Sequence, residues 1–164
     1  MEELENDIDG LGGYLRFDER TDVLASLSVC LMCLRKVEGE FSLWKWAILS
    51  LHNALQGAMV CHLSGTANIG ALSDKSATEY LEWFKGEKKD NPPKEHLAYP
   101  NMLFKRLSNE NKRYEGGAGA VLKITAPQKD SFRRLHNLRN DLSHFTPKGW
   151  AIELAGLPNI FLNM

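Results

Sequence analysis

The chain has 164 residues, of which 43% are hydrophobic and 25% are charged, enough for one domain with a buried core. A formal net charge of -1 excludes a strongly basic protein that binds nucleic acid by charge alone. The acidic first residues do not read as a signal peptide, and three cysteines, an odd number, favour a reducing cytoplasm.

Residues 1–17 are acidic and rich in glycine, which predicts a mobile arm ahead of one domain over residues 18–164. The first helix is expected over residues 21–37 and the second over residues 42–64. The second is apolar almost all round, as expected at the centre of a bundle. Its apolar run is interrupted by His52, Asn53 and Gln56, which argues for a buried helix and against a membrane span.

The second half of the chain continues the helical pattern. Ser76 and Glu79 form a capping-box pattern for a third helix, and residues 102–112 predict a fourth. Thr125 and Gln128 form a second capping box, for a helix that Pro147 ends after residue 143 or 144. Residues 121–125 and 150–154 are expected as short strands, and residues 157–164 read as the start of a helix cut short, so the domain is expected to be truncated there.

Two further groups of residues have alternative interpretations. Cys30 and Cys33 match C-x-x-C, but their helical surroundings favour core packing over a metal or redox site, and we expect no cofactor. His52 and Gln56 share one helix face with i,i+4 spacing. They form either a satisfied buried hydrogen-bond cluster, or a support or dimer contact beneath a functional site. The tryptophans at positions 44, 46 and 83 are expected in the core.

The stretch "LRNDLSHFTP" ends the helix predicted from Pro127. Leu135, Leu138 and Leu142 form its buried stripe, and the polar residues lie on one opposite arc. Arg139 and His144 are about 140° apart on an ideal helix. They can meet on one anion only if the last turn loosens or a second copy completes the site. The polar arc comprises Arg133, His136, Arg139, Asn140, Ser143 and His144.

Residue chemistry allows two interpretations of this arc. An arginine offers a planar fork of donors for a phosphate, and a histidine can take and give protons near neutral pH. Those types suit metal-independent cleavage of a phosphodiester. The spacing by itself favours a solvent-facing surface. Residues 101–150 hold ten Lys or Arg against four acids, a local excess of positive charge that can attract an anion.

The stretch "RNDLSH" resembles the R-x4-6-H motif of the HEPN superfamily, the higher eukaryotes and prokaryotes nucleotide-binding domains. With "LHNALQGAMVCHLSGT" and "LRNDLSHFTPKGWAIELAGLP", it is similar to an uncharacterised bacterial branch of that superfamily. The resemblance implies an all-α, up-and-down bundle of four to five helices, with a short extended or strand segment after the motif helix. It assigns the catalytic positions to Arg139, Asn140 and His144. We expect His52, Gln56 and His136 to support these residues from behind.

The resemblance also implies a function. The chain is expected to be a metal-independent endoribonuclease that leaves 2′,3′-cyclic phosphate ends, of the kind found among toxins and phage-defence effectors. Its expected partners are RNA, a second copy of itself with the motif helices facing each other, and an antitoxin or other protein; no membrane is expected. The alternatives are a non-catalytic HEPN module that binds nucleotide, RNA or protein, and a purely structural helical domain.

Overall fold

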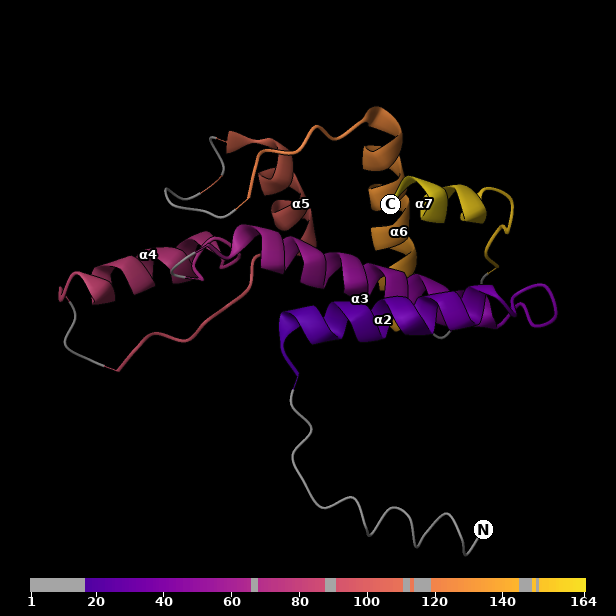
Figure 1. The fold of residues 1–164 in the computed structure, drawn as a ribbon, viewed down its shortest axis with the longest axis horizontal. Helices are drawn as coiled ribbons and strands as arrows, with labels where there is room; N and C mark the ends of the chain where they lie inside the picture. The colour runs from indigo at the N-terminus through magenta and orange to yellow at the C-terminus, as the bar shows by residue number, and fades with distance from the viewer. Residues whose placement is uncertain are drawn as a thin grey trace, which may run out of the picture.

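The computed structural model describes residues 17–65, 68–87, 91–110, 113, 119–144, 149 and 151–164. These residues form helices and no strand, so the predicted all-α bundle is confirmed (Figure 1). The described residues hold six helices, where four to five were expected. None of those described is long and apolar enough to cross a membrane. The helices are α2 (Glu19–Leu34), α3 (Leu43–Leu63), α4 (Asp74–Phe84), α5 (Pro100–Ser108), α6 (Ala126–Ser143) and α7 (Leu157–Asn163).

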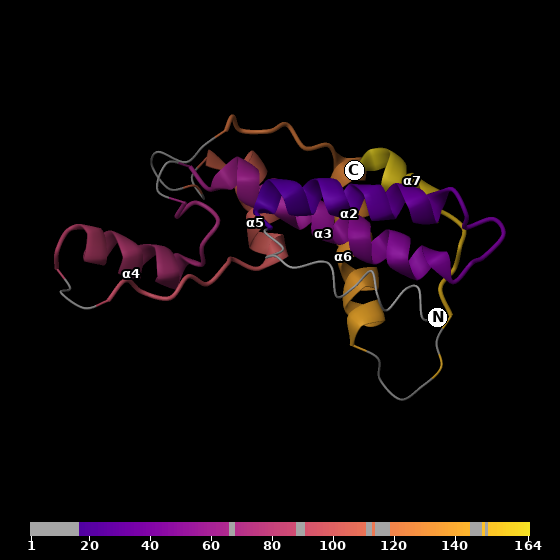
Figure 2. The same cartoon turned by 60° about the horizontal axis from the view of Figure 1, so that its bottom comes forward.

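Helices α2 and α3 lie side by side as an antiparallel hairpin in both views (Figures 1 and 2). A capping box begins α2: Asp18 Oδ1 accepts from the Thr21 backbone N–H at 2.7 Å, and Thr21 Oγ1 accepts from the Asp18 N–H at 2.9 Å. Cys30 and Cys33 are buried on the side of α2 that faces α3, which confirms their place in the core. The predicted acidic arm lies outside the described residues, except for Phe17.

Helix α3 is the centre of the fold because its buried positions serve two hydrophobic clusters. Met59 and Leu63 pack with residues of α5 and with Phe132 of α6, whereas Ile48 packs with residues of α6 and α7. Helices α5 and α6 cross the α2–α3 pair at a steep angle (Figure 1). The α6 residues Leu135 and Leu142 thereby fill the second cluster, as the predicted stripe requires.

Helix α4 projects from the body of the molecule (Figure 2) and is tied to it through a buried arginine. Arg106 of α5 donates to the carbonyls of Gly70 at 2.9 Å and Leu72 at 2.7 Å. Its second terminal nitrogen donates to Asp74 Oδ1 at 2.7 Å, at the first residue of α4. These bonds hold the segment before α4 against α5.

The start of α4 differs from its prediction. The N-cap is Ser73, whose Oγ accepts from the Ser76 N–H, so the Ser76–Glu79 capping box is wrong by three residues. Ser76 is instead buried, and its hydroxyl donates to the Lys94 carbonyl and accepts from the His96 N–H. The Ser76 hydroxyl therefore makes tertiary hydrogen bonds instead of the local capping bond that the sequence pattern predicts.

The expected strands are absent from the described parts of residues 121–125 and 150–154. The described residues there are non-helical, and none of them pairs with a neighbouring strand, so the expected strands are wrong for these residues. The isolated antiparallel bridge described joins Leu72 to Leu97. Trp46 also differs from expectation: it is half exposed, with the Lys45 ammonium 5.2 Å from its ring centroid. The final helix is confirmed as α7.

Replacing Leu135 with alanine tests the packing of α6. This side chain is fully buried in the cluster of α3, α6 and α7, so Leu135→Ala should lower the free energy of unfolding by roughly 2–5 kcal/mol. Leu162→Ala on the exposed face of α7 and His144→Ala should each cost less than about 0.5 kcal/mol. Urea unfolding followed by circular dichroism measures all three. An equal loss for His144→Ala would assign that histidine a structural role.

Candidate functional site

The register of α6 is fixed at its N-terminus by the predicted capping box. Thr125 Oγ1 accepts from the Gln128 N–H at 3.4 Å, and Gln128 Oε1 accepts from the Thr125 N–H at 2.9 Å. With this start, Leu135 and Leu142 are buried and Leu138 is half buried. The polar arc therefore lies on the side of α6 that the sequence predicted. His136 of this arc contacts His52 of α3, and Arg133 and His144 are exposed to solvent.

Four polar side chains form a continuous chain of hydrogen bonds from α6 to α3. Arg139 Nη1 donates to Asn140 Oδ1 at 3.1 Å. Asn140 Nδ2 lies 3.3 Å from His136 Nε2, and His136 Nδ1 lies 3.1 Å from His52 Nε2. The imidazole rings of His52 and His136 are stacked, with centroids 5.3 Å apart.

The direction of this chain follows from its arginine end. A guanidinium only donates, so Asn140 must present its oxygen to Arg139 and its NH₂ to His136. His136 Nε2 then accepts, and in the neutral imidazole the proton sits on Nδ1, which donates to His52 Nε2. The tautomers of both histidines are thus set by the arginine.

Burial and charge keep His52 neutral. Burial lowers the pKa of His52 to about 4, with further lowering from the Arg139 guanidinium and from His136. Burial also lowers the pKa of His136, and Arg139 acts in the same direction. Both histidines are therefore neutral near pH 7, and Arg139 is the cation of this cluster.

Arg139 opens into a pocket of about 510 Å³ between α2, α3 and α6, which we name the arginine pocket. His52 and Gln56 line it from α3, and Ser143 lines it from the last turn of α6. A volume in this range accommodates a nucleotide-sized ligand. The other lining residues are Phe17, Asp22, Ala25, Ser26, Val29, Leu49, Ser50 and Asn53.

His144 is not among the residues that line the arginine pocket. It is the exposed C-cap of α6, with φ -121° and ψ 68°, and its backbone N–H donates to the Asn140 carbonyl. The helix therefore ends at Ser143, and the chain leaves helical geometry at His144. The sequence predicts Pro147 as the residue that ends the helix. Residues 145–148 lie outside the described ranges.

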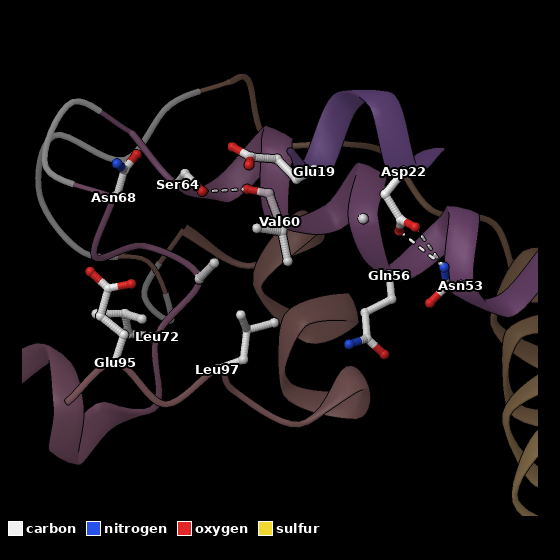
Figure 3. Close-up of a pocket in the computed structure, with 12 residues that line it drawn as sticks. Glu19, Asp22, Asn53, Gln56, Val60, Ser64, Asn68, Leu72, Glu95 and Leu97 are labelled. Atoms are coloured by element: carbon white, nitrogen blue, oxygen red, sulfur yellow. Dashed lines mark hydrogen bonds between the residues drawn. The ribbon is translucent and has the colours of Figure 1, made fainter. Parts of the chain in front are cut away.

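A second pocket of about 370 Å³ adjoins the first and is acidic (Figure 3). Asp22 and Asn53 stand between the two: Asn53 Nδ2 donates to both Asp22 carboxylate oxygens, at 3.2 and 3.0 Å, and to Ser26 Oγ at 2.8 Å. Glu19 reaches this second pocket from α2, and Glu95 reaches it from the segment before α5 (Figure 3). Its charge makes it unsuited to an anion, so the arginine pocket is the candidate site for phosphate.

Sequence reasoning identified the α3 and α6 sides of this pocket but not the α2 side. Arg139, His52 and Gln56 were singled out by residue type and spacing, and the structure brings them together around one cavity. Ser26 and Asp22 were missed. The one available signal was their i,i+4 spacing on the polar edge of α2.

In the described ranges, no group of three His, Cys, Asp or Glu is arranged to hold a metal ion.

The fold and the pocket define an all-α protein with an arginine-lined cavity between three helices. Comparison with models of protein families, with curated proteins and with solved structures found no match to this chain. The HEPN resemblance therefore stays a prediction based on the sequence motif.

The depressed pKa values predict how stability depends on pH. Between about pH 6.5 and pH 4, the unfolded chain protonates His52 while the folded site resists, so the free energy of unfolding should fall as the pH drops through this range. His136 contributes in the same direction. Urea unfolding at pH 7 and pH 5 measures this loss, of which His52 should account for about 1–2 kcal/mol.

The variant His52→Asn should remove that part of the pH dependence, whatever its stability at pH 7. His96→Asn is the matched control because His96 is exposed and lies on a segment away from the pocket. If His52→Asn and the unaltered protein lose the same free energy between pH 7 and pH 5, the histidine pair is not held neutral as the geometry requires.

Proposed function

We propose that this chain is a metal-independent endoribonuclease whose phosphate site is the arginine pocket. The observation that carries the proposal is the placement of Arg139. Its guanidinium is fixed on one side by Asn140 and opens on the other into a cavity of nucleotide size. An oriented arginine in a partly enclosed cavity can hold a phosphate and stabilise the charge of its transition state.

Each motif residue has a distinct role in this proposal. Arg139 holds the phosphate, and Asn140 orients the guanidinium. His144, the exposed C-cap of α6, exchanges protons with the ribose 2′-hydroxyl and the leaving oxygen. Attack of that hydroxyl on the adjacent phosphorus breaks the P–O5′ bond and leaves a 2′,3′-cyclic phosphate.

His52, Gln56 and His136 act as positioning residues. A neutral His52 behind Arg139 accepts from His136 without adding a second positive charge, so the phosphate meets one defined cation. The excess of ten Lys or Arg over four acids in residues 101–150 supports RNA as the polyanion that reaches the site. The proposal further includes a cytoplasmic location, in keeping with three free cysteines, and self-association.

A non-catalytic module is the second candidate, favoured by a specific observation. His144 is exposed and lies outside the residues that line the pocket with Arg139. A pocket with one arginine and no adjacent proton-transfer group would bind a nucleotide, an RNA phosphate or the acidic group of a partner, such as an antitoxin, without cleaving RNA.

The two candidates separate in a cleavage assay. Incubation of the protein with mixed cellular RNA in EDTA should yield fragments with 2′,3′-cyclic phosphate or 3′-phosphate ends. Arg139→Ala should lower the rate about 100-fold or more, because it removes the donor that stabilises the transition state. Arg133→Ala is the matched control: it lies on the same helix, exposed and paired with Asp130, away from the pocket.

His144→Ala should abolish cleavage while RNA binding, measured by fluorescence anisotropy, stays within about twofold. Binding that depends on Arg139 with no cleavage by the unaltered protein would instead establish the module. Cleavage that needs Mg²⁺ and leaves 5′-phosphate ends would rule out the mechanism altogether.

Mixing an Arg139→Ala chain with a His144→Ala chain tests which copy supplies the histidine. Because His144 lies outside the arginine pocket of its own chain, the proposal takes the histidine from a second copy whose motif helix faces the first, and the mixture should regain partial cleavage activity. A mixture that stays inactive would contradict this shared site.

A further inference from the structure

His52 has one ring nitrogen that the hydrogen-bond chain from Arg139 does not use. Its Nε2 is paired with His136 Nδ1, whereas its own Nδ1 has no hydrogen-bond partner among the residues that the structure describes. The side chain is only 3% exposed, yet every fully buried side-chain nitrogen or oxygen in the described part of the chain has a partner. The Nδ1 atom therefore keeps a small open surface, and the arginine pocket is the cavity that His52 lines.

The tautomer of His52 makes this open nitrogen a donor. Because His136 donates from Nδ1, His52 Nε2 accepts, and a neutral imidazole that accepts at one nitrogen carries its proton on the other. The lowered pKa of His52 keeps the ring neutral near pH 7. The proton therefore lies on Nδ1, and the Nδ1–H group opens into the arginine pocket.

Both ends of the hydrogen-bond chain meet the same cavity. Arg139 begins the chain and lines the pocket from α6, and His52 ends the chain and lines the pocket from α3. A ligand in the pocket is thus offered one charged donor and one neutral donor, from two different helices. A nearly buried N–H group from which no described protein atom accepts is uncommon, and it indicates contact with a ligand.

We infer that His52 Nδ1–H donates to a non-bridging oxygen of the phosphodiester that Arg139 holds. This contact rests on the proposed function, since it takes the arginine pocket as the site of the phosphate. A phosphodiester carries one negative charge and two non-bridging oxygens. The guanidinium balances the charge, and the neutral imidazole binds the second oxygen without adding a second positive charge. His52 thereby contacts the substrate directly, in addition to its bond with His136.

Two amide substitutions separate this direct contact from a role in positioning alone. The amide of glutamine reaches about as far as imidazole Nε2, and the amide of asparagine reaches about as far as Nδ1. His52→Gln should therefore keep the bond to His136 and lose the donor in the pocket. His52→Asn should keep a donor in the pocket and lose the bond to His136. If His52 only positioned its neighbours, His52→Asn would be the more damaging change.

Fluorescence anisotropy with a short 2′-O-methyl RNA measures binding to the full chain without cleavage, because the attacking hydroxyl is blocked. His52→Gln should raise the Kd about tenfold, as expected for loss of a hydrogen bond to a charged group, and His52→Asn should raise it less than about threefold. His96→Gln is the matched control and should leave the Kd unchanged, because His96 is exposed and lies away from the pocket. Circular dichroism melting checks that each variant is folded.

The tautomer is measurable in the unaltered protein, independently of any variant. Long-range proton–nitrogen NMR spectra should show His52 protonated at Nδ1, and addition of the 2′-O-methyl RNA should shift that nitrogen resonance. Protonation at Nε2, no shift with RNA, or a loss of binding in His52→Asn that equals or exceeds the loss in His52→Gln would overturn the contact. If Arg139→Ala binds the RNA as tightly as the unaltered protein, the phosphate site of the proposed function fails, and the contact fails with it.

Discussion

The hydrogen bond between His52 and His136 is the interaction on which the arrangement of the site depends. His52 is a buried polar side chain on α3, a helix that otherwise supplies the hydrophobic core. A buried imidazole without a partner costs about 1–3 kcal/mol, so the bond at 3.1 Å strongly constrains where α6 can lie. The same bond joins α3 to the hydrogen-bond chain that begins at Arg139, so the two helices hold the guanidinium, Asn140 and His136 in one arrangement.

The parts of this arrangement that follow from local rules could be predicted. The Thr125–Gln128 capping box set the register of α6, and with it the buried Leu135 and the polar arc that carries Arg139. Helix α3 was recognisable because an apolar run with a few polar interruptions is typical of a central helix. Cys30 and Cys33 could be placed in the core on the same grounds.

The parts that depend on tertiary contacts could not be predicted. Ser76 looks like a cap in the sequence, yet its hydroxyl bonds Lys94 and His96, 18 and 20 residues away, while Ser73 caps α4. The sequence predicts a short strand over residues 121–125, but a strand exists only with a neighbour, and none of the described residues pairs with it as a strand. The α2 side of the pocket was missed because Ser26 and Asp22 acquire their role only through Asn53 of α3. His144 carries the motif's chemistry in the sequence, but its position depends on how the chain leaves α6, which no periodic pattern specifies.

The buried Arg106 has a consequence for the architecture of the whole chain. It holds the turn before α4 through two carbonyls and Asp74, while α4 itself extends away from the other helices (Figure 2). Because the attachment is made at the base of α4, the outer end of that helix adds little to the two main clusters of the core. The far tip of α4 is therefore the place on this fold where a foreign domain or an affinity tag can be inserted with the least disturbance of α3 and α6.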